Sequence, residues 1–282
     1  MLGKVKRRLR PPPPAPAKRT AAKKAAAKKG KRPTSKFPTL PGDRLLEKPV
    51  FILSSIRSGS TLLRVMLNTH SQIHAPHEMH LAGVHLQFGG RFADDAMTEI
   101  GLDEVALQYL LWDRVLHREL TRHGKTVIVN KTPSDSFRWR RILECWPDAR
   151  FIYLLRHPAA IADSWSRAKP DAPMARVVGT VLPYMKAIEQ ARAHHDGLVV
   201  RYEDITVDPE REMRRLCDFI GVEFEPAMVD YGAGDHGSFK AGLGDWSDRI
   251  RSGKVQPIER LPSRDEIPDA LIDISTTWGY LS

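Results

Sequence analysis

Four short apolar runs, rich in β-branched and aromatic residues, alternate along the chain with segments of helical periodicity. They cover residues 51–55, 127–129, 151–155 and 198–200. Strands that alternate with helices form parallel sheets, because each connecting helix packs on a face of the sheet. The pattern predicts a three-layer α/β fold, a parallel sheet flanked by helices, with ligands at the carboxyl ends of the strands.

The most sharply delimited helix is predicted over residues 209–220. Asp208 suits the N-cap, Pro209 suits the first helical position, and Gly221 suits the left-handed residue that ends a helix. Between these ends, one apolar stripe is formed by Met213, Leu216, Cys217 and Ile220. Cys217 is therefore expected in the core. The second cysteine, Cys145, falls on a separate predicted helix, so no disulfide framework is implied.

The first apolar run leads into a tight loop and then into a helix, which is the order of a phosphate-binding loop. Backbone N–H groups at the start of such a helix point into the loop, and the helix dipole favours an anion there. Ser58, Ser60 and Thr61 add hydroxyl donors, and Gly59 permits the turn. A P-loop nucleotide-binding-like site for an anionic group is the prediction.

The loop departs from the nucleoside triphosphate motif GxxxxGK[ST]. In that motif a lysine after the second glycine reaches the terminal phosphates, and the following hydroxyl holds magnesium. Here the loop has one glycine, no lysine follows it, and the cation Arg57 precedes the turn. The pattern favours a reaction other than phosphoryl transfer, with a P-loop kinase of a small molecule as an alternative.

A second cation follows the third apolar run. Arg156 comes directly after it, Pro158 fits the first position of the next helix, and Ser164 lies about two turns into that helix. Arg156 and Ser164 can therefore face one ligand.

These two segments resemble a known family. SSIRSGSTLLRVMLNTHSQI resembles the 5′-phosphosulfate loop of sulfotransferases that use 3′-phosphoadenylyl sulfate (PAPS), above all the branch with tyrosylprotein, heparan and polyketide-associated enzymes. LLRHPAAIADSWSRA resembles the family's 3′-phosphate motif, in which the arginine and the serine hold that phosphate. The resemblance implies a PAPS-dependent sulfotransferase that binds its donor through Arg57, Ser58, Gly59, Ser60, Thr61, Arg156 and Ser164.

Three further segments resemble the family's motifs in the family's order, and the whole resemblance runs from about Pro49 to Trp246. Lys131 matches the lysine near the transferring group, and Tyr202 in a YED segment matches the tyrosine near the adenine. Lys240 matches the lysine of a late KGxxGDW loop, although Phe239 replaces the usual preceding arginine there.

Sulfuryl transfer to a hydroxyl needs a group that removes the acceptor's proton. Cytosolic relatives use a histidine in a KTH segment, but this chain has Pro133 at that place. The segment APHEMHL resembles the one in which the other branch keeps a catalytic glutamate, which implies Glu78 as the base. His80 is the second candidate, because imidazole titrates near neutral pH. Arg57 and Lys131 are expected to stabilise the charge that develops during transfer.

The four histidines His74, His77, His80 and His85 raise the question of a metal site. They form no HExxH arrangement and have no cysteine nearby, and their spacing is expected to spread the rings over different faces. Sulfuryl transfer does not require a metal, and none is expected.

The N-terminal segment differs from the rest of the chain in amino-acid composition. Residues 1–36 carry fourteen of the 44 Lys and Arg residues and no Asp or Glu, in a chain of net charge +10. Proline, alanine and lysine pairs cannot build an apolar core, so we expect a disordered basic tail at 1–40 and a catalytic domain at 41–282. Such a tail suits contact with an anionic polymer or a membrane surface, and equally a solvated segment.

The tail also leaves open a nucleic-acid-associated protein, although the domain has no interleaved aromatic residues for base stacking. The acceptor of a sulfotransferase reaction remains open among small-molecule, carbohydrate, lipid and carrier-bound hydroxyls or an amine. Residues 81–119 and 169–195, between the shared motifs, are expected to wall its pocket. No apolar run approaches the roughly 20 residues of a membrane span, so a cytoplasmic location is expected.

Overall fold

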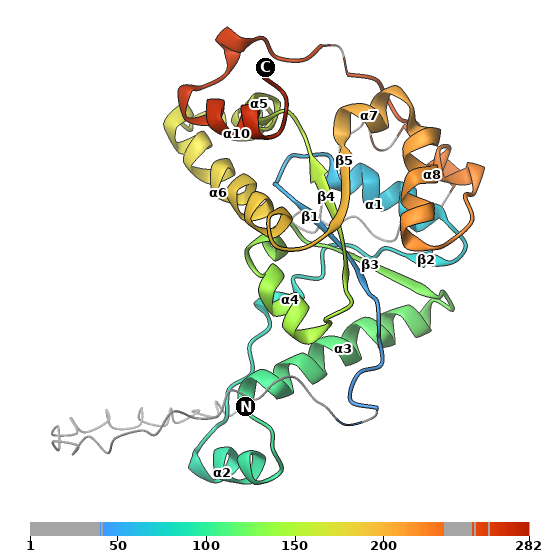
Figure 1. Ribbon diagram of the computed structural model, residues 1–282, viewed down its shortest axis with the longest axis vertical. Helices are drawn as coiled ribbons and strands as arrows, with labels where there is room; N and C mark the ends of the chain where they lie inside the picture. The colour runs from blue at the N-terminus through green and yellow to red at the C-terminus, as the bar shows by residue number, and fades with distance from the viewer. Residues whose placement is uncertain (1–39, 41, 234–249, 251, 259, 282) are drawn as a thin grey trace, which may run out of the picture. The chain divides into compact units, whose positions relative to one another are not determined.

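A five-stranded parallel sheet forms the centre of the protein in a computed structural model that describes residues 40, 42–233, 250, 252–258 and 260–281 (Figure 1). The strands are ordered β2-β3-β1-β4-β5. Their bounds are Val50–Ser54 for β1, Ile73–His74 for β2, Val127–Lys131 for β3, Arg150–Leu155 for β4 and Gly197–Arg201 for β5. The four predicted strands are confirmed, whereas the two-residue β2 was not predicted.

The parallel register brings the functional segments to one edge of the sheet. Lys131, the last residue of β3, pairs with Ile52 of β1, and Leu155, the last residue of β4, pairs with Arg201 of β5. The residues that follow β1, β4 and β5 therefore leave the sheet on the same side. That edge carries the predicted phosphate loop.

Side chains alternate between the two faces of the sheet, and each face is covered by helices (Figure 1). Ile52 and Leu154 pack in one cluster with α1 (Ser60–Thr69), α7 (Tyr202–Val207) and α8 (Pro209–Ile220). Phe51 and Tyr153 pack in the other, with α3 (Glu104–Arg122), α4 (Trp139–Cys145), α5 (Pro158–Ala168), α6 (Met174–Arg192) and α10 (Ile272–Thr277). The short α2 covers Arg91–Glu99 and buries no residue. The predicted three-layer α/β fold is confirmed.

The ends of α8 follow the predicted caps. The Asp208 carboxylate accepts a hydrogen bond from the Arg211 N–H at 3.1 Å, and Gly221 ends the helix with φ of 85°. Cys217 is buried in α8 and Cys145 is buried in α4, and both thiols are free. The core position predicted for Cys217 and the separate helices predicted for the two cysteines are confirmed.

The N-terminal tail and Lys240 lie outside the described residues, apart from Leu40 at the tail's predicted end. The division of the chain at residue 40 therefore stays a prediction. In the part of the chain that the structure describes, none of the helices combines the length and apolar character that crossing a membrane demands.

A 3₁₀ turn after β3, η2 (Pro133–Phe137), braces the end of β1. The Ser136 hydroxyl accepts from the Ser54 N–H and donates to the Ser54 carbonyl oxygen, both at 3.1 Å. Beside it, the buried Asp135 carboxyl accepts from Asn130 Nδ2 at 2.7 Å. Burial raises the pKa of Asp135 to about 7, against the lowering effects of Arg138 and of the Asn130 bond.

We predict that Asp135→Asn changes the dependence of stability on pH. The raised pKa means that the folded protein keeps a proton which the unfolded chain releases above its ordinary pKa of 3.8. This contribution to stability is therefore complete below pH 3.8 and is lost as pH rises to about 7, at about 1.4 kcal/mol per pH unit. Asn keeps an acceptor for Asn130 but cannot titrate.

Urea unfolding of both proteins from about pH 5 to pH 8 measures this difference. The unfolding free energy of the wild type should fall relative to that of the variant as pH rises to about 7. Above that pH, the two plots of unfolding free energy against pH should run parallel. Curves that stay parallel over the whole range would contradict the assignment.

Candidate active site

The loop between β1 and α1 holds two residues in the left-handed backbone region. Arg57 has φ of 63° and Gly59 has φ of 84°, and α1 begins at Ser60. The buried Ser58 hydroxyl donates to the Ser55 carbonyl oxygen at 2.7 Å, so its hydrogen is used inside the loop. The loop therefore has a defined shape that presents the start of the ten-residue helix α1 to the edge of the sheet.

Gly59 is packed against the ring of Tyr202. A Cβ atom at position 59 would lie 2.2 Å from Cδ2 and 2.4 Å from Cε2 of Tyr202, far inside contact distance. Tyr202 is the first residue of α7, directly after β5. Both the positive φ and the close approach of the ring require glycine at this position.

Arg156 also packs against the Tyr202 ring. Its Cζ lies 4.6 Å from the ring centroid, and its Nη1 donates to the Arg57 carbonyl oxygen at 2.8 Å. Arg57 Nε in turn donates to Ser164 Oγ at 3.1 Å. Burial lowers the pKa of Arg156 from its ordinary value. The two segments that resemble phosphate motifs, about a hundred residues apart, thus meet through direct hydrogen bonds.

A cavity of about 1080 Å³ opens beside this contact. Eight of the predicted site residues line it: Arg57, Gly59, Ser60, Thr61, Glu78, Arg156, Ser164 and Tyr202. Ser58 and Lys131 are buried next to it and do not line it, while Lys240 lies outside the described residues. A helix start and a half-buried arginine on one cavity form a site for a ligand with anionic groups at two places.

Glu78 reaches the cavity between two basic side chains. Its Oε1 lies 2.5 Å from Nζ of Lys131, whose side chain is 1% exposed, and its Oε2 lies 3.4 Å from Nε2 of His80. The His80 side chain is half exposed. Taking Lys131 out of water is costly without an opposite charge, so the ion pair to Glu78 offsets that cost and holds the carboxylate in place.

Arg64 is a charged neighbour that the sequence analysis did not select. This buried residue of α1 donates from Nη1 to the Ala75 carbonyl oxygen at 3.0 Å, three residues before Glu78. Burial lowers the pKa of Arg64 to about 10, and the charge of Glu78 raises it in part. The signal in the sequence was a lone arginine inside the apolar run 62–67, where a buried charge needs a partner.

The glutamate of the YED segment ties the C-terminal part of the chain to the site. Glu203 Oε1 accepts from the His157 N–H at 2.9 Å, and Oε2 accepts from the Tyr280 hydroxyl at 2.7 Å. The Arg201 guanidinium lies 4.5 Å from the Tyr280 ring centroid. Glu203, the residue after Tyr202, therefore fixes the turn that follows Arg156.

The walls of the cavity differ from those expected for the acceptor pocket. Among the residues that the structure describes, none from 81–119 lines the cavity, and the segment 169–195 contributes only Met174. Instead, lining residues come from α5, including Trp165, and from the segment 254–268, including Leu261. Neither segment forms much of this cavity, to which the chain returns after α8, and their place in the walls of the acceptor pocket stays a prediction.

Comparisons with known proteins identify the family to which the chain belongs. Residues 49–226, more than half of the chain, match the model of the family described as "Sulfotransferase family". The chain is 31% identical over 166 residues to the omega-hydroxy-beta-dihydromenaquinone-9 sulfotransferase of Mycobacterium tuberculosis (strain CDC 1551 / Oshkosh), covering 50% of this chain and 42% of that protein. It is 26% identical over 215 residues to the nodulation protein NoeE of Sinorhizobium fredii (strain NBRC 101917 / NGR234), covering 64% and 51%. The chain spans about half the length of these relatives.

Two solved structures share the fold. The sulfotransferase domain from the curacin biosynthetic pathway matches with a TM-score of 0.63 and 24% identity, covering 84% of this chain and 99% of that domain. The sulfotransferase domain of the Synechococcus PCC 7002 olefin synthase matches with a TM-score of 0.61 and 25% identity, covering 85% and 98%. The resemblance seen in the sequence is confirmed, and the chain belongs to the sulfotransferase family.

Proposed function

We propose that this chain transfers a sulfuryl group from PAPS to an acceptor hydroxyl or amine. The observation that carries the proposal is one cavity lined by the start of α1, by Arg156 and Ser164, and by the carboxylate Glu78. Two anion-binding places and a proton acceptor are what this reaction needs, and membership of the sulfotransferase family supports the assignment.

The donor would lie with its two charged ends at the two motifs. The N–H groups at the start of α1 and the hydroxyls of Ser60 and Thr61 would hold the 5′-phosphosulfate. Arg156 and Ser164 would hold the 3′-phosphate, with Tyr202 beside the nucleoside between them. Ser58 would contribute its backbone and shape the loop, since its hydroxyl donates to Ser55. The assignment of Lys240 to the 3′-phosphate stays a prediction.

In the proposed reaction Glu78 takes the proton from the acceptor as its oxygen or nitrogen bonds to sulfur. The bond from sulfur to the bridging phosphate oxygen breaks, and its electron pair leaves with 3′-phosphoadenosine 5′-phosphate. Lys131 holds Oε1 of Glu78, so Oε2 is the oxygen assigned to the proton. His80, 3.4 Å from Oε2 and half exposed, could pass that proton to solvent.

Fixed cations would stabilise the charge that grows on the bridging oxygen. Arg57 lines the cavity, and Lys131 lies directly behind Glu78, so both are placed to act electrostatically without a metal at this site. The buried Arg64 adds a third positive charge close to Glu78. Together these cations would keep Glu78 correctly oriented before the acceptor enters.

For the acceptor we favour a hydroxyl attached to a partly apolar body. Trp165, Met174 and Leu261 line the cavity, and the last two are nearly half exposed. A relative named for a hydroxylated dihydromenaquinone supports the same class. Small-molecule, lipid and carrier-bound acceptors all fit this description, while contact of the tail with an anionic polymer or a membrane surface stays a prediction. So does the cytoplasmic location.

Neither alternative gains support. A P-loop kinase would use a lysine directly after Gly59, where this chain has Ser60 at the first position of α1. A nucleic-acid-associated function rested on the basic tail, which lies outside the described residues.

The donor assignment predicts a preference among nucleotides. In isothermal titration, 3′-phosphoadenosine 5′-phosphate should bind at least tenfold more tightly than adenosine 5′-phosphate or ATP with magnesium, since only it places phosphates at both motifs. Ser164→Ala should reduce the difference in affinity between 3′-phosphoadenosine 5′-phosphate and adenosine 5′-phosphate. Ser166→Ala, in the same helix, serves as the control. Tighter binding of ATP with magnesium would refute the donor assignment.

The base assignment predicts different effects for two neighbouring residues. Glu78→Gln keeps an acceptor for Lys131 but takes up no proton, so kcat should fall roughly 10²- to 10⁴-fold with little change in donor affinity. His80→Gln should lower kcat by roughly tenfold or less. His77→Gln is the matched control.

The assay follows radiolabelled sulfate from the donor into a cell extract, with the unfolding free energy of each variant measured in parallel. If His80→Gln abolished turnover while Glu78→Gln remained active, the base would be His80.

A further inference from the structure

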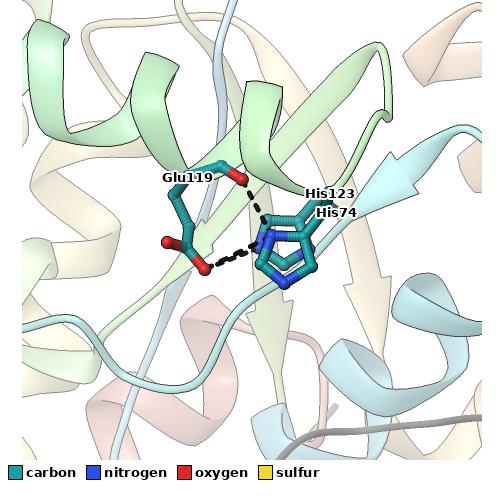
Figure 2. Close-up of side chains that lie close together, drawn as sticks. All are labelled: His74, Glu119 and His123. Atoms are coloured by element: carbon teal, nitrogen blue, oxygen red, sulfur yellow. Dashed lines mark hydrogen bonds and ion pairs between the residues drawn. The ribbon is translucent and has the colours of Figure 1, made fainter.

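A cluster of nitrogen and oxygen donors lies at the edge of the sheet, outside the cavity described above. Figure 2 shows His74 from β2 together with Glu119 from the last turn of α3 and His123, the residue that caps the end of that helix. Their candidate ligand atoms lie within 4.8 Å of one another, and among the described residues this is the one group of His, Cys, Asp and Glu side chains so arranged. The proposed sulfuryl transfer makes no use of it.

Two separations within the cluster are close to those around a tetrahedral metal ion. His74 Nε2 lies 3.3 Å and His123 Nδ1 lies 3.4 Å from the same oxygen, Oε1 of Glu119 (Figure 2). Ligand atoms about 2 Å from a tetrahedral zinc ion are about 3.3 Å apart. Glu119 and His123 are four residues apart, so they lie on one face of the helix end, opposite the strand that carries His74.

Burial favours the neutral form of the His74 imidazole, which is the form that binds metal. Burial, together with the neighbouring His123, lowers the pKa of His74 to about 4 against the raising effect of Glu119. Lys125, whose ammonium donates to the Ile73 carbonyl oxygen at 2.7 Å, acts in the same direction as His123. The His74 ring is therefore neutral near pH 7 and carries one N–H, which must be on Nδ1 for Nε2 to bind a metal.

We propose that His74, Glu119 and His123 bind one divalent transition-metal ion of the zinc class, with water completing the coordination. Two imidazole nitrogens and one carboxylate oxygen are a ligand set that Zn²⁺ accepts, and a hard ion such as Mg²⁺ or Ca²⁺ prefers oxygen alone. The two rings are stacked with centroids 3.8 Å apart, and His123 Nδ1 donates to the Glu119 carbonyl oxygen at 2.9 Å. The His123 ring must therefore turn and give up this hydrogen bond for both imidazoles to reach one ion. Its side chain is 40% exposed.

An ion at this place would tie the edge strand β2 to α3. His74 lies four residues before Glu78, and the segment between them carries the Ala75 carbonyl oxygen that Arg64 binds. The ion would therefore stabilise the segment that positions Glu78, without touching the reacting groups. This role is independent of the proposed reaction.

Titration of the full chain with Zn²⁺ tests the proposal, after a chelator has removed bound metal. Calorimetry should find one ion per chain. On titration with Co²⁺, the visible spectrum should show an intense absorption band, which indicates a Co²⁺ ion of low coordination number. His123→Ala and Glu119→Gln should each weaken Zn²⁺ binding at least about tenfold and remove that band. His117→Ala, another histidine of the same helix, should bind as the wild type does.

The wild type alone should also gain thermal stability from Zn²⁺. His123 and Glu119 are not buried, so their variants are expected to fold, and unfolding curves without metal check this. Absence of stoichiometric binding, or equal binding by the wild type and both variants, would overturn the proposal. In that case Glu119 would only hold two imidazoles by hydrogen bonds.

Discussion

The contact between Gly59 and Tyr202 sets the geometry of this protein's site. The left-handed glycine after β1 leaves room for the ring at the start of α7, and a single added carbon would collide with it. Arg156 packs against the same ring and donates to the Arg57 carbonyl oxygen. Three segments that follow three different strands are thereby held at one place, which is how a parallel sheet builds a nucleotide site.

Buried charge is the second constraint. Lys131 is buried at the end of β3, and Arg64 is buried in α1, both close to Glu78. Such groups stabilise a fold poorly, because the cost of removing them from water is close to what their pairing returns. Their place beside the cavity is consistent with a function for Glu78, whose position they restrict.

The strands and α8 could be predicted because their signals are local. Apolar runs mark the four longer strands, and Asp208 and Gly221 mark the ends of α8. The two-residue β2 was missed, since Ile73 and His74 are too few to form a pattern. The meeting of Arg156 with the Gly59 loop was predicted from the order of motifs, and it was found in the structure.

What was missed depends on contacts between distant parts of the chain. Lys131 was expected near the transferring group, but its burial against Glu78 depends on how two loops fold together. His74 was considered only with histidines nearby in the sequence, whereas its neighbours Glu119 and His123 come from α3. The lining of the cavity by 254–268 likewise depends on the return of the chain, which no local pattern records.

The affinity of Gly59→Ala for 3′-phosphoadenosine 5′-phosphate tests the central claim most directly. Gly101→Ala is the control, because Gly101 has a similar φ of 79° but open space where its Cβ would stand. The packing of Tyr202 on Gly59 predicts a loss of affinity of at least roughly tenfold for Gly59→Ala and almost none for Gly101→Ala. Equal affinities of Gly59→Ala and the wild type would contradict the account.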